Sequence, residues 1–204
     1  MLNAAMSGGA GLIELRDREH PRNAIERSGQ TFRRLANTYG ALFIVNDDPH
    51  LALELRADGV HVGQDDMDPA EARKIMGPDA IIGLSTHSRE QIQAAAEAPV
   101  DYISVGPIWE TPTKAGRPAT GLELIRTASE IERRPWFAIG GIDTDNADEV
   151  VSAGAERLCV VRAIRDAPDP RAAASALFGA VDAAARAERE MRGRSTAEGE
   201  ERPA

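Results

Sequence analysis

The segment DYISVGPIWETPTKAGRP, residues 101–118, decides the fold class of this chain. It opens with an apolar run, DYISV at 101–105, and then passes into a loop that carries glycines, prolines, two threonines and a lysine. A short run rich in Ile and Val with little polar alternation is typical of a strand buried on both faces of a parallel sheet. A polar loop directly behind such a strand is where parallel barrels keep their functional residues.

Six further apolar runs share this character. They are GLIEL (11–15), ALFIV (41–45), GVHV (59–62), AIIGL (80–84), WFAI (136–139) and RLCVV (157–161). Segments with a helical pattern separate them, at 24–40, 68–77, 88–98, 121–133 and 145–155, and a final helical pattern covers 172–191. Alternating strands and helices predict a parallel sheet with helices packed against it.

Capping residues mark the ends of several of these helices. N-caps are expected at Asp48, Asp68, Ser88 and Asp145. Helices are expected to end at Gly40, Gly77 and Gly154. We therefore interpret Asp48 and Asp68 as caps and not as ligands.

A parallel sheet of this kind is either a closed (β/α)8 barrel or an open doubly wound sheet. The open form with a dinucleotide site would carry a Gly-x-Gly-x-x-Gly motif after its first strand, and the sequence has none there. We therefore predict an α/β protein with a (β/α)8 TIM barrel. A barrel needs eight strands and the sequence offers seven candidates. The missing strand is the first, because residues 4–11 have the composition of the end of a helix.

We predict one TIM-barrel domain over residues 1–188, followed by a charged, disordered tail at 189–204. Without its first strand, the barrel would leave two strand edges unpaired. We consider two explanations for the deficit. Either the start of the sequence is misassigned and a short upstream segment is missing, or a partner chain covers the gap.

Charge and composition exclude several classes of function. The chain has 204 residues, with 33 acidic and 24 basic side chains and a formal net charge of −9. This balance argues against nucleic acid or an anionic membrane as the main partner. Cys159 is the only cysteine, so an internal disulfide is excluded. We see neither a signal peptide nor an apolar run near the roughly 20 residues that span a bilayer, and we expect a cytoplasmic protein that can form homo-oligomers.

Polar residues follow each predicted strand, and in a barrel these positions meet at one end, which we call the mouth. They are Arg16, Arg18, Asn46, Asp47, Asp66, Ser85, Thr111, Thr113, Lys114, Gly140, Gly141 and Arg162. Asp47 and Asp66 follow neighbouring strands, where two carboxylates repel each other unless a cation or a proton lies between them. Because Mg²⁺ prefers oxygen ligands of this kind, we interpret the pair as candidate metal ligands.

The cationic residues of the mouth indicate a site for more than one phosphate. Positive charge comes from Arg16, Arg18, Lys114 and Arg162. The Gly-Gly turn at 140–141 lets backbone N–H groups approach a phosphate closely. The mouth offers no cysteine nucleophile and no Ser/His/Asp arrangement. Chemistry that needs phosphates, a divalent cation and little else is the departure of a diphosphate.

Five motifs together resemble one enzyme family, the thiamine phosphate synthases. They are VNDD (45–48), GVHVGQDD (59–66), IIGLSTH (81–87), DYISVGPIWETPTK (101–114) and AIGGI (138–142). The resemblance covers about residues 11 to 165 in order and spacing, and it implies a (β/α)8 barrel. It also implies that 4-amino-2-methyl-5-hydroxymethylpyrimidine diphosphate is joined to 4-methyl-5-(2-hydroxyethyl)thiazole phosphate, with Mg²⁺ as cofactor, giving thiamine phosphate and diphosphate.

The same resemblance implies roles for individual residues. Asp47 and Asp66 look like the Mg²⁺ ligands. Contacts to the pyrimidine diphosphate are implied at Glu14, Arg16, Arg18, Asn46, Ser85 and Lys114, and among these Lys114, Arg16 and Ser85 look like the catalytic residues. Contacts to the thiazole phosphate are implied at Thr111, Thr113, Gly141, Val161 and Arg162. The loop at 106–118 would thereby serve both substrates.

Three positions depart from the family pattern. Glu14 stands where the family has Gln, and it adds a negative charge near the diphosphate. Arg18 stands in place of Lys, which keeps the charge and changes its geometry. Arg162 stands in place of Ser, and it could bind a phosphate through two hydrogen bonds or point away from it.

Two other interpretations stay open. A thiazole tautomerase-like barrel would need neither the carboxylate pair nor Lys114, and Mg²⁺-dependent binding of the pyrimidine diphosphate would separate it from a synthase. A truncated, non-catalytic phosphate-binding remnant is suggested by the missing strand and by Glu14. Cooperative thermal unfolding of the chain would argue against a broken barrel.

Overall fold

The computed structural model of the protein describes residues 1–111 and 116–200, and for residue 188 and residues 191–200 the backbone alone. Seven strands form one parallel sheet in which each strand pairs with the next along the chain. They are β1 (Leu12–Leu15), β2 (Leu42–Asn46), β3 (Gly59–Val62), β4 (Ile81–Thr86), β5 (Tyr102–Val105), β6 (Trp136–Ile139) and β7 (Leu158–Cys159). All seven predicted strands are present, so the parallel α/β prediction is confirmed.

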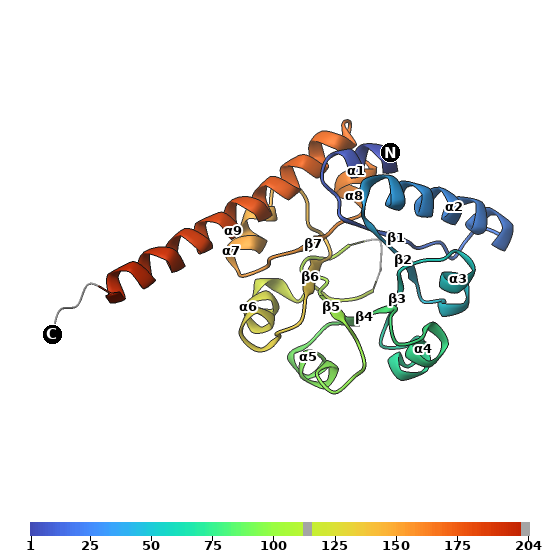
Figure 1. The fold of residues 1–204 in the computed structure, drawn as a ribbon, viewed down its shortest axis with the longest axis horizontal. Coiled ribbons are helices and arrows are strands. Elements are labelled where there is room, and N and C mark those ends of the chain that lie inside the picture. The colour runs from blue at the N-terminus through green and yellow to red at the C-terminus, as the bar shows by residue number, and fades with distance from the viewer. Residues whose placement is uncertain (112–115, 201–204) are drawn as a thin grey trace.

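The sheet curls into an incomplete barrel with the helices on its outside, as Figure 1 shows. Strands β1 and β7 end the strand order, and the described residues form no ladder between them. This is a TIM-like barrel with one strand fewer than eight, as predicted from the sequence. The hypotheses of a misassigned start and of a covering partner chain stay predictions.

Nine helices are described, and most of them follow a strand. They are α1 (Leu2–Ser7), α2 (Arg22–Tyr39), α3 (Pro49–Glu54), α4 (Pro69–Met76), α5 (Arg89–Ala95), α6 (Gly121–Ile131), α7 (Ala147–Ser152), α8 (Arg162–Arg165) and α9 (Pro170–Glu200). Helix α1 packs on α9 so closely that a Cβ atom at Gly8 would lie 2.5 Å from the Arg171 carbonyl oxygen. Helix α9 continues to Glu200. The domain boundary at residue 188 and the disorder of residues 189–204 stay predictions.

Three of the four predicted N-caps are confirmed. The side chains of Asp48, Asp68 and Ser88 each accept a hydrogen bond from a backbone N–H of the helix that follows. The fourth prediction, Asp145, is wrong, because α7 begins after Asn146. The Asp143 side chain accepts hydrogen bonds from the N–H groups of Asp145 and Asn146. The turn before the helix is therefore held by Asp143.

The two faces of the sheet differ in polarity. Val60 and Val62 on β3 belong to the hydrophobic core under the helices, and His61 between them points to the inner face. On β4 and β5, Ser85 and Ser104 are register partners and are likewise buried on the inner side. The apolar core therefore lies between sheet and helices, and the inner faces of β3, β4 and β5 carry polar side chains that lead up to the mouth.

At the opposite end from the mouth, the strands are tied by ion pairs. Asp58 lies directly before β3, and its Oδ2 accepts the backbone N–H of Phe43 at 2.7 Å and the Arg33 guanidinium at 2.9 Å. The pair thereby links β2, β3 and the helix α2. The Arg33 guanidinium also lies over the Phe43 ring, 5.8 Å from its centroid.

The same arrangement recurs two strands further on. Asp101 lies directly before β5, and its Oδ2 accepts the N–H of Ile82 at 2.7 Å and the Arg73 guanidinium at 2.6 Å. Arg73 also donates to the backbone carbonyls of Gly77 and Pro78 at 3.2 Å. Both carboxylates are therefore satisfied by a backbone donor and an arginine, which is the pattern of a structural pair.

Candidate active site

Arg16 and Asn46 meet at the mouth. Arg16 follows β1 and Asn46 ends β2, and the Arg16 Nη1 donates to the Asn46 Oδ1 at 3.0 Å. Both residues are half-buried. The structure therefore brings together two of the residues that the sequence assigns to the diphosphate.

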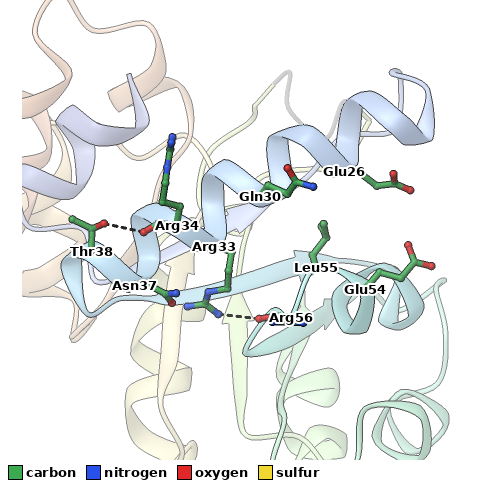
Figure 2. A pocket seen from close by; sticks show the side chains of 9 residues that line it. All are labelled: Glu26, Gln30, Arg33, Arg34, Asn37, Thr38, Glu54, Leu55 and Arg56. Atoms are coloured by element: carbon green, nitrogen blue, oxygen red, sulfur yellow. Dashed lines mark hydrogen bonds between the residues drawn. The ribbon is translucent and has the colours of Figure 1, made fainter.

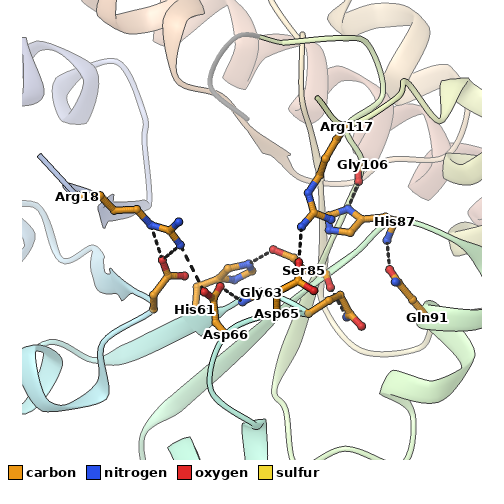
Figure 3. Close-up of polar contacts among 12 residues, drawn as sticks. Arg18, His61, Gly63, Asp65, Asp66, Ser85, His87, Gln91, Gly106 and Arg117 are labelled. Carbon is orange, nitrogen blue, oxygen red and sulfur yellow. Dashed lines mark hydrogen bonds and ion pairs between the residues drawn. The ribbon is translucent and has the colours of Figure 1, made fainter. Parts of the chain in front are cut away.

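The two candidate metal ligands share one arginine, as Figure 3 shows for Arg18 and Asp66. The Arg18 Nε donates to the Asp47 Oδ2 at 3.0 Å, and its Nη2 contacts the same oxygen. The same Nη2 lies 3.4 Å from the Asp66 Oδ1. The Arg18 side chain is 58% exposed, whereas those of Asp47 and Asp66 are 21% and 29% exposed. Two carboxylates from neighbouring strand ends thus converge on a single cationic group.

Backbone geometry holds both carboxylates in place. Asp47 has a φ of 67°, in the left-handed region, and its N–H donates to the His61 carbonyl at 2.7 Å. The Asp66 Oδ2 accepts the N–H of Gly63 at 2.9 Å. A Cβ atom at Gly63 would lie 2.6 Å from that carboxylate oxygen, so a larger residue there would displace the Asp66 side chain.

The electrostatics of the pair are those of two carboxylates that share one guanidinium. Burial raises the pKa of Asp47, the Arg18 hydrogen bond lowers it, and the nearby Asp66 carboxylate raises it again, with a net pKa above the ordinary value. Within the described ranges, no group of three or more His, Cys, Asp and Glu side chains is arranged to hold a metal. Two carboxylates nevertheless fit Mg²⁺, which is commonly held by one or two of them together with substrate phosphates.

Ser85 lies below the mouth in a buried polar group. Its Oγ is 2.9 Å from the His61 Nε2, and its carbonyl accepts the Gln64 Nε2 at 2.6 Å. Ser85 is 2% and His61 is 6% exposed. His61 is thus a buried residue whose ring lies beside Ser85.

His87 braces the loop after β5. Its ring Nδ1 contacts the Gly106 carbonyl oxygen, and its N–H donates to the Gln91 Oε1 at 2.7 Å. Figure 3 shows His87 between Gly106 and Gln91. These contacts give His87 a structural role in the loop.

The first part of the loop at 106–118 is pinned to the end of β6. The N–H of Ile108 donates to the Ile139 carbonyl at 2.9 Å, and the N–H of Trp109 donates to the Gly140 carbonyl at 3.0 Å. Gly141 has a φ of 70°, and a Cβ atom there would lie 2.6 Å from the Trp109 Cβ. The Gly-Gly turn therefore allows a close approach, and the backbone that approaches it is this loop. Thr111 follows as a half-buried residue.

The remaining predicted residues lie in different surroundings. Val161 and Arg162 follow β7 and are both exposed. Glu14 is half-buried on β1, two residues below Arg16, and is the register partner of Ile44. Thr113 and Lys114 lie outside the described residues.

Several contacts at the site were not predicted from the sequence. Gln64, which lies inside the matched motif GVHVGQDD, contacts the Ser85 carbonyl. Arg117 reaches across the mouth to Asp65, 3.2 Å away. Tyr102 donates to or accepts from the His61 Nδ1 at 2.9 Å. The signal for Tyr102 is its place on the inner face of β5, since it alternates there with the core residues Ile103 and Val105.

A separate groove of about 910 Å³ lies on the outer surface, between α2 and the turn after α3 (Figure 2). It is lined by Glu26, Gln30, Arg33, Arg34, Asn37, Thr38, Glu54, Leu55 and Arg56. The groove contains none of the residues predicted for the site. The strand ends, and not this groove, therefore carry the candidate chemistry.

Comparison with known proteins identifies the family of this chain. A family model described as thiamine monophosphate synthase matches residues 1–164. A thiamine-phosphate synthase of Thermus thermophilus is 51% identical over 174 residues, which cover 85% of this chain and 84% of the relative. One from Acidothermus cellulolyticus is 48% identical over 186 residues, 90% of this chain and 88% of the relative.

Solved structures give the same result. A thiamine phosphate pyrophosphorylase from Pyrococcus furiosus superposes with a TM-score of 0.83 at 36% identity, covering 90% of this chain and 88% of that one. A 3-hexulose-6-phosphate synthase, at 17% identity and a TM-score of 0.62, shares the fold alone. No described helix is long and apolar enough to cross a membrane. The family model matches most of the chain, and two relatives share about half of its residues. The chain therefore belongs to the thiamine monophosphate synthase family.

Proposed function

We propose that this chain is a transferase that joins 4-amino-2-methyl-5-hydroxymethylpyrimidine diphosphate to 4-methyl-5-(2-hydroxyethyl)thiazole phosphate. The products are thiamine phosphate and diphosphate. The observation that carries the proposal is the convergence of Asp47 and Asp66 on Arg18 at the mouth. A tautomerase acting on the thiazole phosphate alone would not need this arrangement.

The reaction replaces one bond at the methylene carbon of the pyrimidine. The C–O bond to the diphosphate breaks and its electron pair stays on the diphosphate oxygen. The thiazole nitrogen then forms the C–N bond with its lone pair. The aminopyrimidine ring can stabilise the cation that the departing diphosphate leaves behind, so the chain has to stabilise mainly the leaving group and to align the nitrogen.

The leaving diphosphate is assigned to the cationic side of the mouth. Arg16, fixed by Asn46, presents its guanidinium there, and Arg18 and Lys114 are proposed to add two further positive charges. Developing charge on a leaving oxygen is stabilised most by groups that are already oriented. Arg16 is such a group because its hydrogen bond to Asn46 fixes the side chain before the substrate arrives.

Asp47 and Asp66 are the residues that would hold Mg²⁺. When bound, the ion neutralises negative charge on the diphosphate and orients it. The chain contributes the two carboxylates, the Gly63 N–H that orients Asp66, and Arg18, which balances part of their charge.

The thiazole phosphate is assigned to the other side of the mouth. Thr111, Thr113, Gly141, Val161 and Arg162 are proposed as its contacts. The tight packing of Trp109 on Gly141 supports this, because it fixes the start of the threonine loop against the end of β6. Glu14 and Ser85 are assigned to the pyrimidine side.

The test is formation of thiamine phosphate from both substrates, with and without Mg²⁺, followed by chromatography of the product. We expect product that depends on Mg²⁺ and on both substrates. Product formed equally well after removal of divalent cations would contradict the assignment of Asp47 and Asp66. The cytoplasmic location and the homo-oligomer expected from the sequence stay predictions.

A further inference from the structure

Three buried polar side chains form a hydrogen-bonded row on the inner face of the barrel, below the mouth. The Tyr102 hydroxyl is 2.9 Å from the His61 Nδ1, and the His61 Nε2 is 2.9 Å from the Ser85 Oγ. Tyr102 and His61 are each 6% exposed and Ser85 is 2% exposed. Figure 3 shows the contact between His61 and Ser85. This hydrogen-bonded row runs from the interior of the barrel toward the carboxyl end of β4.

A glycine makes room for this contact. Gly83 on β4 is the register partner of both His61 on β3 and Tyr102 on β5, so it lies between them. A Cβ atom at Gly83 would lie 2.2 Å from the Tyr102 Cζ and 2.4 Å from the His61 Nδ1. Any larger residue would push the tyrosine and histidine apart. The local sequence is therefore suited to this one hydrogen bond.

The direction of the first hydrogen bond follows from burial. Among the described residues, Tyr102 has no hydrogen-bond partner other than the His61 Nδ1. Burial, with smaller effects of Glu14 and Cys159, raises the pKa of Tyr102 well above its ordinary value, so the phenol keeps its proton. A buried O–H group without an acceptor is costly. The Tyr102 O–H therefore donates and the His61 Nδ1 accepts.

The direction of this hydrogen bond also fixes the other hydrogen bond of the row. With its Nδ1 as an acceptor, neutral His61 carries its proton on Nε2. The Nε2–H then donates to the Ser85 Oγ at 2.9 Å, with the Ser104 Oγ as a more distant neighbour at 3.4 Å. Among the described residues, the reverse direction would leave the buried tyrosine proton without an acceptor.

Ser85 is left with a proton to donate. Its Oγ accepts from His61, and within the part of the chain that the structure describes its hydroxyl has no acceptor of its own. Ser85 stands near the end of β4, at the mouth. A ligand with a neutral acceptor atom at this position would accept the Ser85 hydroxyl proton. A ring nitrogen of an aminopyrimidine is such an atom.

We propose that Tyr102 is a positioning residue: through the His61 tautomer that it selects, it turns the Ser85 hydroxyl into a hydrogen-bond donor toward the pyrimidine ring. This rests on the proposed function for its kinetic consequence. The tautomer itself does not depend on that function. Tyr102 does not touch the substrate, so its effect on the reaction passes entirely through Ser85.

The first test is ¹⁵N NMR of the histidine rings in the substrate-free wild-type chain, with Tyr102→Phe for comparison. We expect His61 to have a protonated Nε2 and an unprotonated Nδ1, and to lose this fixed pattern in Tyr102→Phe. A wild-type His61 that carries its proton on Nδ1 overturns the proposal. Since this result comes from the wild-type chain, it does not depend on whether the variant folds.

The second test is a double-mutant cycle in the synthase assay. Tyr102→Phe should lower kcat roughly tenfold, the size of one well-oriented hydrogen bond, with little change in KM for the thiazole phosphate. In a Ser85→Ala background the same substitution should change kcat by less than about twofold, because the residue through which it acts is gone. Equal losses in both backgrounds overturn the proposal, since Tyr102 would then act without Ser85.

Tyr39→Phe is the matched control. It makes the same chemical change at the surface, where the Tyr39 hydroxyl donates to the Asn3 Oδ1 at 2.9 Å, and kcat should not change. If the wild-type chain forms no thiamine phosphate, the proposed function is wrong. The NMR result then decides the tautomer separately.

Discussion

The two ends of the barrel use the same kinds of residue for opposite purposes. At the amino ends of the strands, Asp58 and Asp101 each accept a backbone N–H and an arginine. At the mouth, Asp47 and Asp66 share the one exposed guanidinium of Arg18. At the amino ends each carboxylate has an arginine of its own, whereas at the mouth two carboxylates contact the same guanidinium.

This difference separates a stabilising ion pair from a binding site. A carboxylate that is paired one to one with an arginine has its charge balanced within the fold. At the mouth, burial and the neighbouring Asp66 carboxylate raise the pKa of Asp47, and a bound cation can offset this unfavourable interaction. In parallel barrels the carboxyl ends of the strands carry the chemistry and the amino ends the stability, and these aspartates follow that division.

The largest effect is expected at the mouth. Asp66→Ala should lower kcat/KM by roughly 100- to 1000-fold, the range for loss of one preorganised electrostatic group, as measured by thiamine phosphate formation at saturating Mg²⁺. Asp65→Ala is the matched control, because the neighbouring Asp65 side chain is 87% exposed and contacts Arg117. Similar losses in both variants would contradict the assignment of Asp66.

The second-largest effect is expected at the amino ends of the strands. Arg73→Ala should lower the free energy of unfolding by about 1–3 kcal/mol, because the guanidinium, which is only 21% exposed, donates hydrogen bonds to Asp101 and to the Gly77 and Pro78 carbonyls. Urea denaturation measures this loss. Activity per folded molecule should not change. Asp101→Asn should cost less, since its amide oxygen can still accept the Ile82 N–H. A large loss of kcat in Arg73→Ala without a loss of stability would erase the distinction between the two ends.

A smaller effect of opposite sign is expected when the mouth is neutralised. In the metal-free protein, Asp47→Asn should raise the melting temperature at neutral pH by a few degrees. The folded-state pKa of Asp47 is raised, so the wild type loses stability as the pH rises past the unfolded value near 3.8. The advantage of the variant should vanish as the pH falls below that value. A variant that melts below the wild type at neutral pH would show that the carboxylate stabilises the fold.

The smallest effect is expected at Arg162. This residue is exposed, so Arg162→Ala should raise KM for the thiazole phosphate by no more than about fivefold, as for a solvent-exposed charge contact. Arg165→Ala, which removes the exposed ion pair with Asp166, should leave KM unchanged. A much larger rise for Arg162→Ala would show that its guanidinium binds the phosphate directly.

Much of the fold could be predicted because it depends on local patterns. Buried strands and their N-caps leave a signature in a few consecutive residues, as at Val60, Val62 and Asp68. The wrong cap at Asp145 shows the limit of this reasoning. Asp143, Asp145 and Asn146 are all good capping residues, and the backbone of the turn, not the residue type, decides which one begins the helix.

The site could be predicted in part, for a similar reason. The position of Asp47 and Asp66 on neighbouring strand ends follows from the strand order alone. That Arg18 lies between them depends on the path of the loop after β1. The hydrogen-bonded row from Tyr102 through His61 to Ser85 depends on the register of three strands and on the space left at Gly83. No single motif reveals either of these.

The most direct test of the functional mouth is calorimetric titration of diphosphate into the wild-type chain and into Asp66→Asn, each with and without Mg²⁺. Binding should occur in the wild type only when Mg²⁺ is present, and should be lost in the variant at the same Mg²⁺ concentration. Equally tight binding without Mg²⁺, or unchanged binding in Asp66→Asn, would show that the aspartate pair at the mouth is not a metal-dependent diphosphate site.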